Sequence, residues 1–318
     1  SLKQGFSLPP EQQAIRDKCI HPSGTFVEFP IEDVEAPIPA RFEKIVRMYP
    51  ERIALTMGDR ALTYDELNRY ANRIARAILA KRGPGSEPIA LLFDKGIDVI
   101  AAIFGVLKAG KAYVVIDPSF PNDRISHILE DCQSCLLVTN QRNIDLSQKF
   151  LNDGRRLLNI DEIGDSRVCN DPNLPISPKC LSSILYTSGS TGNPKGVAKS
   201  HRNQLHAVMV HTNATRISCH DRLTLLHTVG FGSAEAHLFQ ALLNGAMLCS
   251  FDLNSEGIHR LLPWLNEESV TVFHSPPSVF RQLAETMLEG EKCPHLRLIR
   301  LSGASVSHLE SDLYKQKF

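Results

Sequence analysis

The sequence lacks any apolar run long enough to cross a membrane. Its longest run, residues 99–107, is far shorter than the roughly 20 residues that a spanning helix needs. The first residues also lack the basic-then-apolar pattern of a secretory signal. We therefore expect no membrane association and a cytoplasmic location.

An excess of charge of either sign is also absent. Lys+Arg and Asp+Glu both number 35, which gives a formal net charge of zero at pH 7. Such a chain has no overall field that attracts nucleic acid or an anionic membrane, so neither is an expected partner. Any site for an anion must then be built locally.

Cysteines with the spacing of a metal site are nearly absent. The eight cysteines are scattered, and Cys132 and Cys135 form the single C-x-x-C pair. A structural zinc site needs four ligands, and no second pair stands at a suitable distance. We expect reduced thiols and no metal held by these residues.

The length and the apolar content are what a layered fold requires. With 318 residues, 42% of them hydrophobic, the chain can build two or more units around large cores. Short apolar strands alternate with amphipathic helices on both sides of a looser segment, about residues 140–180. The alternation predicts an α/β fold of two stacked, doubly wound, mostly parallel sheets with flanking helices.

Local sequence signals also predict where the helices, strands and domains lie. A capping box of Thr63 and Glu66 should open a long helix that Gly83 closes. We divide the chain into a leader or linker (1–40), a first α/β subdomain (41–180) and a second one (181–318). The expected strands are 89–93, 112–116, 136–139, 222–228, 246–251, 270–273 and 296–301, and the expected helices are 97–108, 122–131, 234–243, 257–266 and 278–288.

The segment 186–197 is the most informative part of the sequence. It combines glycines, hydroxyl side chains and Lys195 in one loop. Glycines let backbone N–H groups turn toward an anion, hydroxyls add donors and the lysine adds a positive charge. It is not a Walker A loop, because Gly189 is followed three residues later by Gly192, and Lys195 by Gly196. The segment predicts a cradle for the phosphates of a nucleotide.

This segment closely resembles the signature loop of the acyl-adenylate-forming family, which includes nonribosomal peptide synthetase adenylation domains, acyl-CoA synthetases and luciferases. Residues 62–67 resemble the first core motif of that family. Residues 107–118, followed by Pro121 and Arg124, resemble the second, in the form typical of peptide synthetases. Three motifs in the right order make the chain similar to the large N-terminal portion of an adenylation domain.

The resemblance implies a reaction and its cofactors. A substrate carboxylate would attack the α-phosphate of ATP, with Mg²⁺, to give an acyl-AMP and pyrophosphate. The acyl group would then pass to the phosphopantetheine thiol of a carrier protein domain. Two alternatives stay open: an acyl-CoA ligase that uses free coenzyme A, and a nucleotide-binding scaffold module without catalysis.

The resemblance also implies residue roles. The residues that would hold the β- and γ-phosphates are Thr187, Ser188, Gly189, Ser190, Thr191, Gly192 and Lys195, with Thr187 and Lys195 acting in catalysis. Gly303, Ala304 and Ser305 would lie against the nucleotide. The acyl pocket would be lined by Phe231, Gly232, Ser233, Ala236, His274, Arg300 and Ser302.

One pocket position departs from the family pattern. Amino-acid-activating members carry an Asp directly after the Phe to hold the α-ammonium group, and this chain has Gly232 there. We therefore expect a carboxylic acid without an α-amino group, unless Glu235 turns inward and replaces the missing carboxylate. Arg300 suggests a polar or anionic group on the substrate, or equally an ion pair with a structural carboxylate. His274 is either a pocket residue or a satisfied core histidine.

The later family motifs do not occur before Phe318. These are the segment with the glutamate that associates with Mg²⁺, the ribose-binding aspartate, the hinge and the lysine of the small C-terminal adenylation subdomain. The resemblance implies that catalysis needs that subdomain as a partner. We expect residues 1–318 alone to form acyl-AMP poorly.

Overall fold

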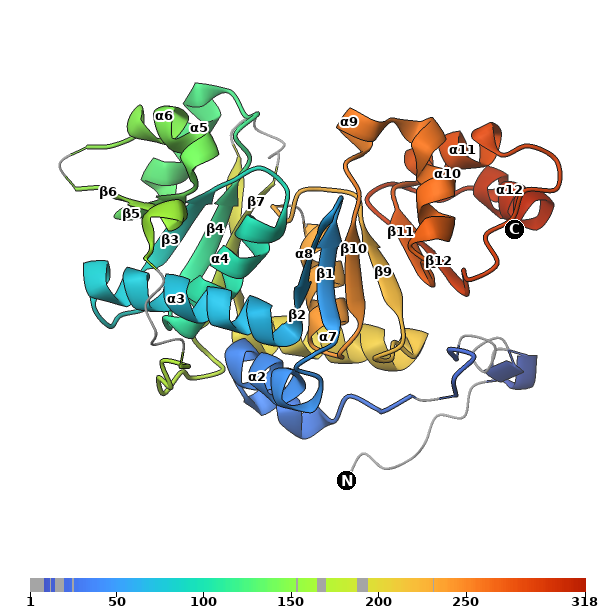
Figure 1. Cartoon of the computed structure of the whole chain (residues 1–318), viewed down its shortest axis with the longest axis horizontal. Helices are drawn as coiled ribbons and strands as arrows, with labels where there is room; N and C mark the ends of the chain where they lie inside the picture. Colours follow the sequence, from blue (N-terminus) through green and yellow to red (C-terminus); the bar gives the residue numbers. More distant parts are fainter. Residues whose placement is uncertain are drawn as a thin grey trace.

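Two six-stranded sheets organise the chain, side by side in Figure 1. This computed structural model describes residues 9–11, 13–14, 20–24, 26–152, 154–164, 170–187, 194–230 and 232–318. One sheet has the strand order β6-β5-β3-β4-β7-β8, and the other has the order β12-β11-β9-β10-β1-β2. Each sheet is parallel except for one antiparallel pair at an edge, β7 with β8 and β1 with β2. The predicted α/β class and mostly parallel sheets are confirmed.

The strands of the first sheet follow one another closely in the sequence. They are β3 (Pro88–Leu92), β4 (Ala112–Ile116), β5 (Leu136–Thr139), β6 (Arg156–Asn159), β7 (Leu181–Thr187) and β8 (Lys195–Ser200). The second sheet takes its strands from both ends of the described chain. They are β1 (Ile53–Met57), β2 (Arg60–Thr63), β9 (Arg222–Leu225), β10 (Met247–Ser250), β11 (Val272–Ser275) and β12 (Leu298–Leu301).

Helices cover both faces of each sheet. The central layer consists of α3 (Tyr64–Arg82), α4 (Ile97–Lys108), α7 (His201–Thr215) and α8 (Gly232–Leu242), with α2 (Ile38–Met48) beside it. The outer layers are α5 (Asn122–Asp131) and α6 (Ile144–Gln148) on the first sheet, and α9 (Leu253–Glu256), α10 (Ile258–Glu267), α11 (Pro277–Thr286) and α12 (His308–Lys317) on the second. Short 3-10 helices span Ile31–Glu35, Gln141–Asn143 and Ile160–Glu162. None of the described helices combines the length and apolar character that crossing a bilayer requires.

The cores follow from the alternation of side chains along each strand. In β3, Ile89 and Leu91 pack into the central cluster between the sheets, whereas Ala90 and Leu92 pack outward against α5. A strand that is buried on both faces has a continuous apolar sequence, and this is why β3 could be predicted from the sequence. The second sheet has its own outer cluster under α10 and α11.

The predicted helix signals are confirmed at the residue level. Thr63 accepts from the backbone N–H of Glu66, and the Glu66 side chain accepts from the backbone of Thr63. The helix ends at Gly83, whose φ of 69° is easily reached by glycine. Helices 97–108 and 122–131 and strands 112–116 and 136–139 have the bounds that the sequence predicted.

Three regions differ from the prediction. The looser segment 140–180 contains α6 and the paired strand β6, whose four residues carry too little pattern to be read. Within the predicted leader, Phe29 is buried, and its backbone N–H and C=O both bond to the Asn213 side chain. Helix α2 begins at Ile38, before the predicted boundary at residue 40.

The sheets do not separate at residue 180. Strands β7 and β8 pair within the first sheet, although they lie in the predicted second subdomain. Conversely, β1 and β2 lie in the predicted first subdomain but pair within the second sheet. Sequence order could not reveal this, because pairing partners far apart in the sequence, such as Leu55 and Leu248, leave no local signal. Strand pairing alone does not define domains, so the predicted boundaries stay a prediction.

The residues of the second motif have structural roles. Lys108 is fully buried, and its ammonium group lies 2.5 Å from both Glu43 and Asp171. Asp117, after β4, accepts a hydrogen bond of 3.0 Å from the Thr228 hydroxyl, after β9. This bond joins the carboxyl ends of strands in the two sheets.

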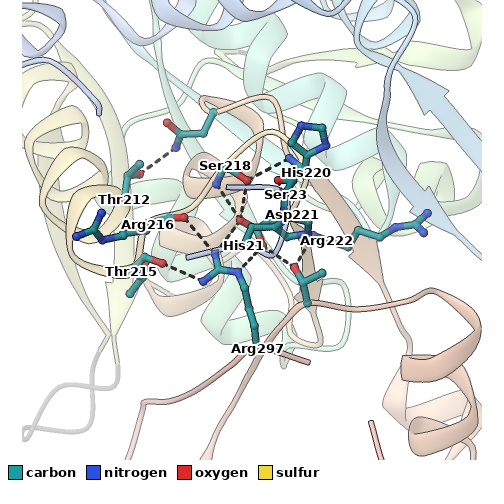
Figure 2. A network of polar contacts seen from close by, with 12 residues as sticks. His21, Ser23, Thr212, Thr215, Arg216, Ser218, His220, Asp221, Arg222 and Arg297 are labelled. Atoms are coloured by element: carbon teal, nitrogen blue, oxygen red, sulfur yellow. Dashed lines mark hydrogen bonds and ion pairs between the residues drawn. The ribbon is translucent and has the colours of Figure 1, made fainter. Parts of the chain in front are cut away.

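A buried ion pair lies at the amino ends of strands of the second sheet (Figure 2). Arg297 donates to Asp221 across 2.7 Å, and the two side chains are only 6% and 0% exposed. Asp221 also accepts from the Thr271 hydroxyl and the Ser218 backbone. Burial alone would raise the pKa of Asp221, but these bonds and the Arg297 charge hold it below its usual value.

We predict that Asp221→Asn lowers the free energy of unfolding by about 3–5 kcal/mol, because it leaves Arg297 buried without a counter-charge. Urea denaturation at pH 7 measures the change. Since the folded pKa of Asp221 is depressed, the wild-type contribution is full above a pH of about 4 and is lost as pH falls through the folded pKa. The matched control Glu267→Gln breaks an exposed pair with Arg260 and should leave the midpoint unchanged. Equal midpoints for Asp221→Asn and wild type would contradict this reading.

Candidate active site

The antiparallel edge of the first sheet presents the predicted phosphate loop. Strand β7 ends at Thr187 and β8 begins at Lys195, and these two residues are paired across the hairpin. Both are exposed. Ser188, Gly189, Ser190, Thr191 and Gly192 lie outside the described residues.

Helix α5 holds the base of this hairpin. The Tyr186 hydroxyl donates to Asp131 across 2.5 Å, and the ring N–H of His127 donates to the Pro194 carbonyl across 3.2 Å. Gly196 is required by packing, because a Cβ there would lie 2.9 Å from Cγ2 of Ile184. The two ends of the loop are therefore fixed by contacts outside the loop.

The hairpin lies beside the start of α8, where the predicted acyl pocket begins. A Cβ added to Gly232 would lie 3.7 Å from Cδ1 of Leu185, which stands two residues before Thr187 on β7. That distance is an ordinary van der Waals contact, and Gly232 is exposed. The described end of β7 thus lies beside position 232, where an added Cβ would make an ordinary contact.

Four of the predicted site residues line one cavity of about 200 Å³. They are Ser233, His274, Ser302 and Gly303, and the remaining lining residues are His227 and Pro276. His274 Nε2 and the Ser302 hydroxyl are 2.6 Å apart. Gly303 has a φ of 89°, a conformation that glycine adopts without strain.

Sequence reasoning missed His227 in this lining. The residue stands two positions after the last residue of β9, at the carboxyl end of a parallel strand, which is where ligands bind in open α/β sheets. That position was the available signal. The predicted strand ran to residue 228, which placed His227 inside the sheet instead of at its end.

One of the residues that line the cavity, His274, stacks on a second histidine. The rings of His237, on α8, and His274, on β11, lie 3.5 Å apart with an angle of 3° between their planes. Burial, helped by the nearby charge of Arg300, lowers the pKa of His274 to about 3, so its ring is neutral at pH 7. His237 is 1% exposed, and neither of its ring nitrogens has a hydrogen-bond partner among the described residues.

Arg300 lies beside His274 on the same face of the sheet, because the two residues are paired across β11 and β12. Its guanidinium contacts Gln240 at 3.3 Å and His211 at 3.2 Å. No carboxylate in the described part of the chain forms an ion pair with it. Burial lowers the pKa of Arg300 from its usual value. The explanation of Arg300 as half of a structural ion pair is therefore wrong for the residues described.

Glu235 turns inward but is already engaged. Its carboxylate accepts from the buried hydroxyl of Tyr113 and lies 2.7 Å from the ammonium group of Lys199 on β8. Its side chain is 3% exposed. Glu235 joins α8 to both β4 and β8 through these contacts.

A neighbouring cavity of about 320 Å³ lies at the carboxyl ends of strands from both sheets. His227 belongs to both linings, and Asp117 and Lys95 line this second cavity. Burial lowers the pKa of Lys95 to about 8, although Asp252 opposes the shift. Because Asp117 lines it, this cavity connects the second motif to the candidate site.

The remaining predicted site residues that the structure describes do not line the cavity of about 200 Å³. Phe231 lies outside the described residues, Ala236 is half-buried on α8, and Ala304 and Ser305 are exposed after β12. Cys132 and Cys135 are free thiols. No three His, Cys, Asp or Glu side chains of the described residues stand close enough to hold a metal ion.

Comparison with known proteins places the chain among long synthetases. It is 32% identical to tyrocidine synthase 1 of Brevibacillus parabrevis over 279 residues, which are 87% of this chain and 25% of that protein. It is 30% identical to gramicidin S synthase 2 of Brevibacillus brevis over 295 residues, which are 87% of this chain and 6% of that protein. The chain thus spans a quarter or less of the length of these relatives.

Solved structures agree on the fold. The nonribosomal peptide synthetase FmoA3, in its alpha-methyl-L-serine-AMP bound form, superposes with a TM-score of 0.82 at 23% identity, covering 97% of this chain and 34% of that one. A family model described as AMP-binding enzyme matches residues 42–313. The chain belongs to the AMP-binding enzyme family.

Proposed function

We propose that this chain is part of an enzyme that uses ATP to activate a carboxylic acid as an acyl-AMP, with release of pyrophosphate. The observation that carries the proposal is the contact between the β7–β8 hairpin and the start of α8, where Leu185 lies beside Gly232. A hairpin that grips phosphates and a pocket that holds an acid must adjoin for the acid to reach phosphorus. Family membership supports the same reaction.

The chemistry requires orientation more than proton transfer. The substrate carboxylate is ionised at neutral pH and needs no general base. One of its oxygens forms a bond to the α-phosphorus, the bond from that phosphorus to the bridging oxygen breaks, and pyrophosphate leaves with the electron pair. Thr187 and Lys195, with the loop between them, would hold the β- and γ-phosphates during this displacement.

We further propose that the acid lacks an α-amino group. Gly232 stands where amino-acid-activating relatives of the family carry the ammonium-binding aspartate. Glu235, the substitute that the sequence offered, is already paired with Lys199 at 2.7 Å. An ammonium group that loses its carboxylate costs about 3–5 kcal/mol, or more than a hundredfold in affinity.

The acceptor of the acyl group follows from the similarity to long synthetases. We propose transfer to the phosphopantetheine thiol of a carrier protein, with the small C-terminal adenylation subdomain as a second partner and a cytoplasmic location. Free coenzyme A as acceptor is the alternative within the same chemistry. A binding scaffold without catalysis is the alternative of another class.

We predict that the complete natural protein catalyses ATP–pyrophosphate exchange with keto, hydroxy, fatty or aryl acids in preference to the corresponding α-amino acids. The reason is the missing carboxylate at position 232. Preference for an amino acid would contradict the substrate proposal. Absence of exchange with any acid would favour the binding scaffold without catalysis. Thioester formation with free coenzyme A, but not with a carrier domain, would favour the ligase.

We predict that Gly232→Asp moves this preference toward α-amino acids, by about tenfold to a hundredfold in the ratio of kcat/KM values. Position 232 has room for the side chain, and a carboxylate at a helix N-terminus is favourable. Gly232→Asn is the matched control, because it adds the same bulk without charge. An equal change in both variants would show that size alone, and not the carboxylate, governs the preference.

A further inference from the structure

A guanidinium without a carboxylate partner among the described residues stands next to the acyl cavity, because Arg300 is paired across β11 and β12 with His274, which lines that cavity. Arg300, from β12, lies among His211 of α7, His237 of α8 and His274 of β11. All three imidazoles have a pKa below the ordinary value, mainly through burial, and are neutral at pH 7. The cluster therefore carries the single charge of the guanidinium.

Several other partly or fully buried cations in this half of the molecule are paired with a carboxylate. Arg297 stands three residues before Arg300 and lies 2.7 Å from Asp221. Lys199 lies 2.7 Å from Glu235, and Arg281 pairs with Glu310. Arg300 differs from these cations because its described partners, Gln240 and His211, are both neutral. Removing a cation from water without a counter-charge is costly, so a bound anion would recover that cost.

The free donors around Arg300 point to the same kind of ligand. The buried ring of His237 has no hydrogen-bond partner among the described residues and stacks on His274. A neutral imidazole donates from one nitrogen, and a guanidinium presents a planar fork that matches a carboxylate. His274 also reaches Ser302 at the cavity that includes Ser233. An acyl chain in that cavity would extend toward this cluster.

We propose that the activated acid carries a second carboxylate, which Arg300 binds at the far end of the acyl pocket. The substrate class is thus a short dicarboxylic acid. This inference rests on the proposed function, because it names the substrate of the same site. One carboxylate would react at the α-phosphate, and the other would remain bound to the guanidinium.

The test is ATP–pyrophosphate exchange by the complete protein with four-, five- and six-carbon dicarboxylic acids and their monoamides. Each monoamide has the size of its diacid but a neutral far end. We expect at least one diacid to exceed its monoamide about tenfold or more in kcat/KM. Wild-type exchange that favours the monoamide or a simple monoacid at every length overturns the inference and leaves the proposed function intact. No exchange with any acid counts against both.

Variants at the cluster test whether Arg300 is the cause. Arg300→Met should lower the diacid-to-monoamide ratio about thirtyfold or more, the effect of removing one partner of a buried charge pair. Gln240→Glu places an internal carboxylate on Arg300, which Gln240 already contacts at 3.3 Å, and should lower the ratio without removing the arginine. The second variant keeps the test decisive if the first one unfolds.

Arg260→Met is the control, because Arg260 forms an exposed pair with Glu267 on α10. It should leave the ratio unchanged. A ratio that stays at the wild-type value in both cluster variants would contradict the assignment of Arg300.

Discussion

The position of the candidate site depends on one constraint, the return of the chain after Thr187. Strand β7 runs parallel to β4, and β8 turns back beside it, so Thr187 and Lys195 are paired at the edge of the sheet. Contacts from His127 and Asp131 on α5 hold both arms of the hairpin. Because Leu185 on the same strand lies next to Gly232, fixing the hairpin also fixes its distance from the acyl cavity.

Charge pairing distinguishes the framework of this protein from its cavity. Several buried cations of the framework lie near a carboxylate, as Lys108 does with Glu43 and Asp171, and Arg297 with Asp221. Such pairs cost much when one partner is removed, so they hold elements in place. Arg300 and its neutral imidazole neighbours do not follow this arrangement. The difference supports the proposal that Arg300 serves substrate recognition whereas Arg297 belongs to the framework, although only two residues separate them in the sequence.

Much of the fold could be predicted from the sequence, because strands that are buried on both faces appear as short apolar runs. The ends of α3 could be predicted because Thr63, Glu66 and Gly83 mark them. Strand β6 could not be predicted, because a strand of four residues carries too little pattern. The pairing of β1 with β10 could not be predicted, because distant partners leave no local pattern. The resemblance named His274, Ser302 and Arg300. It could not supply His237, Gln240 or His211, because only the packing of α7 and α8 on the sheet brings them to Arg300.

The most direct test of this account is a crystal structure of the complete protein with a non-hydrolysable ATP analogue. The account predicts that the triphosphate tail lies at the open end of the β7–β8 hairpin, between Thr187 and Lys195, with the α-phosphate turned toward the cavity beside Gly232. A tail bound elsewhere, or a hairpin end with no room for an anion, would contradict it.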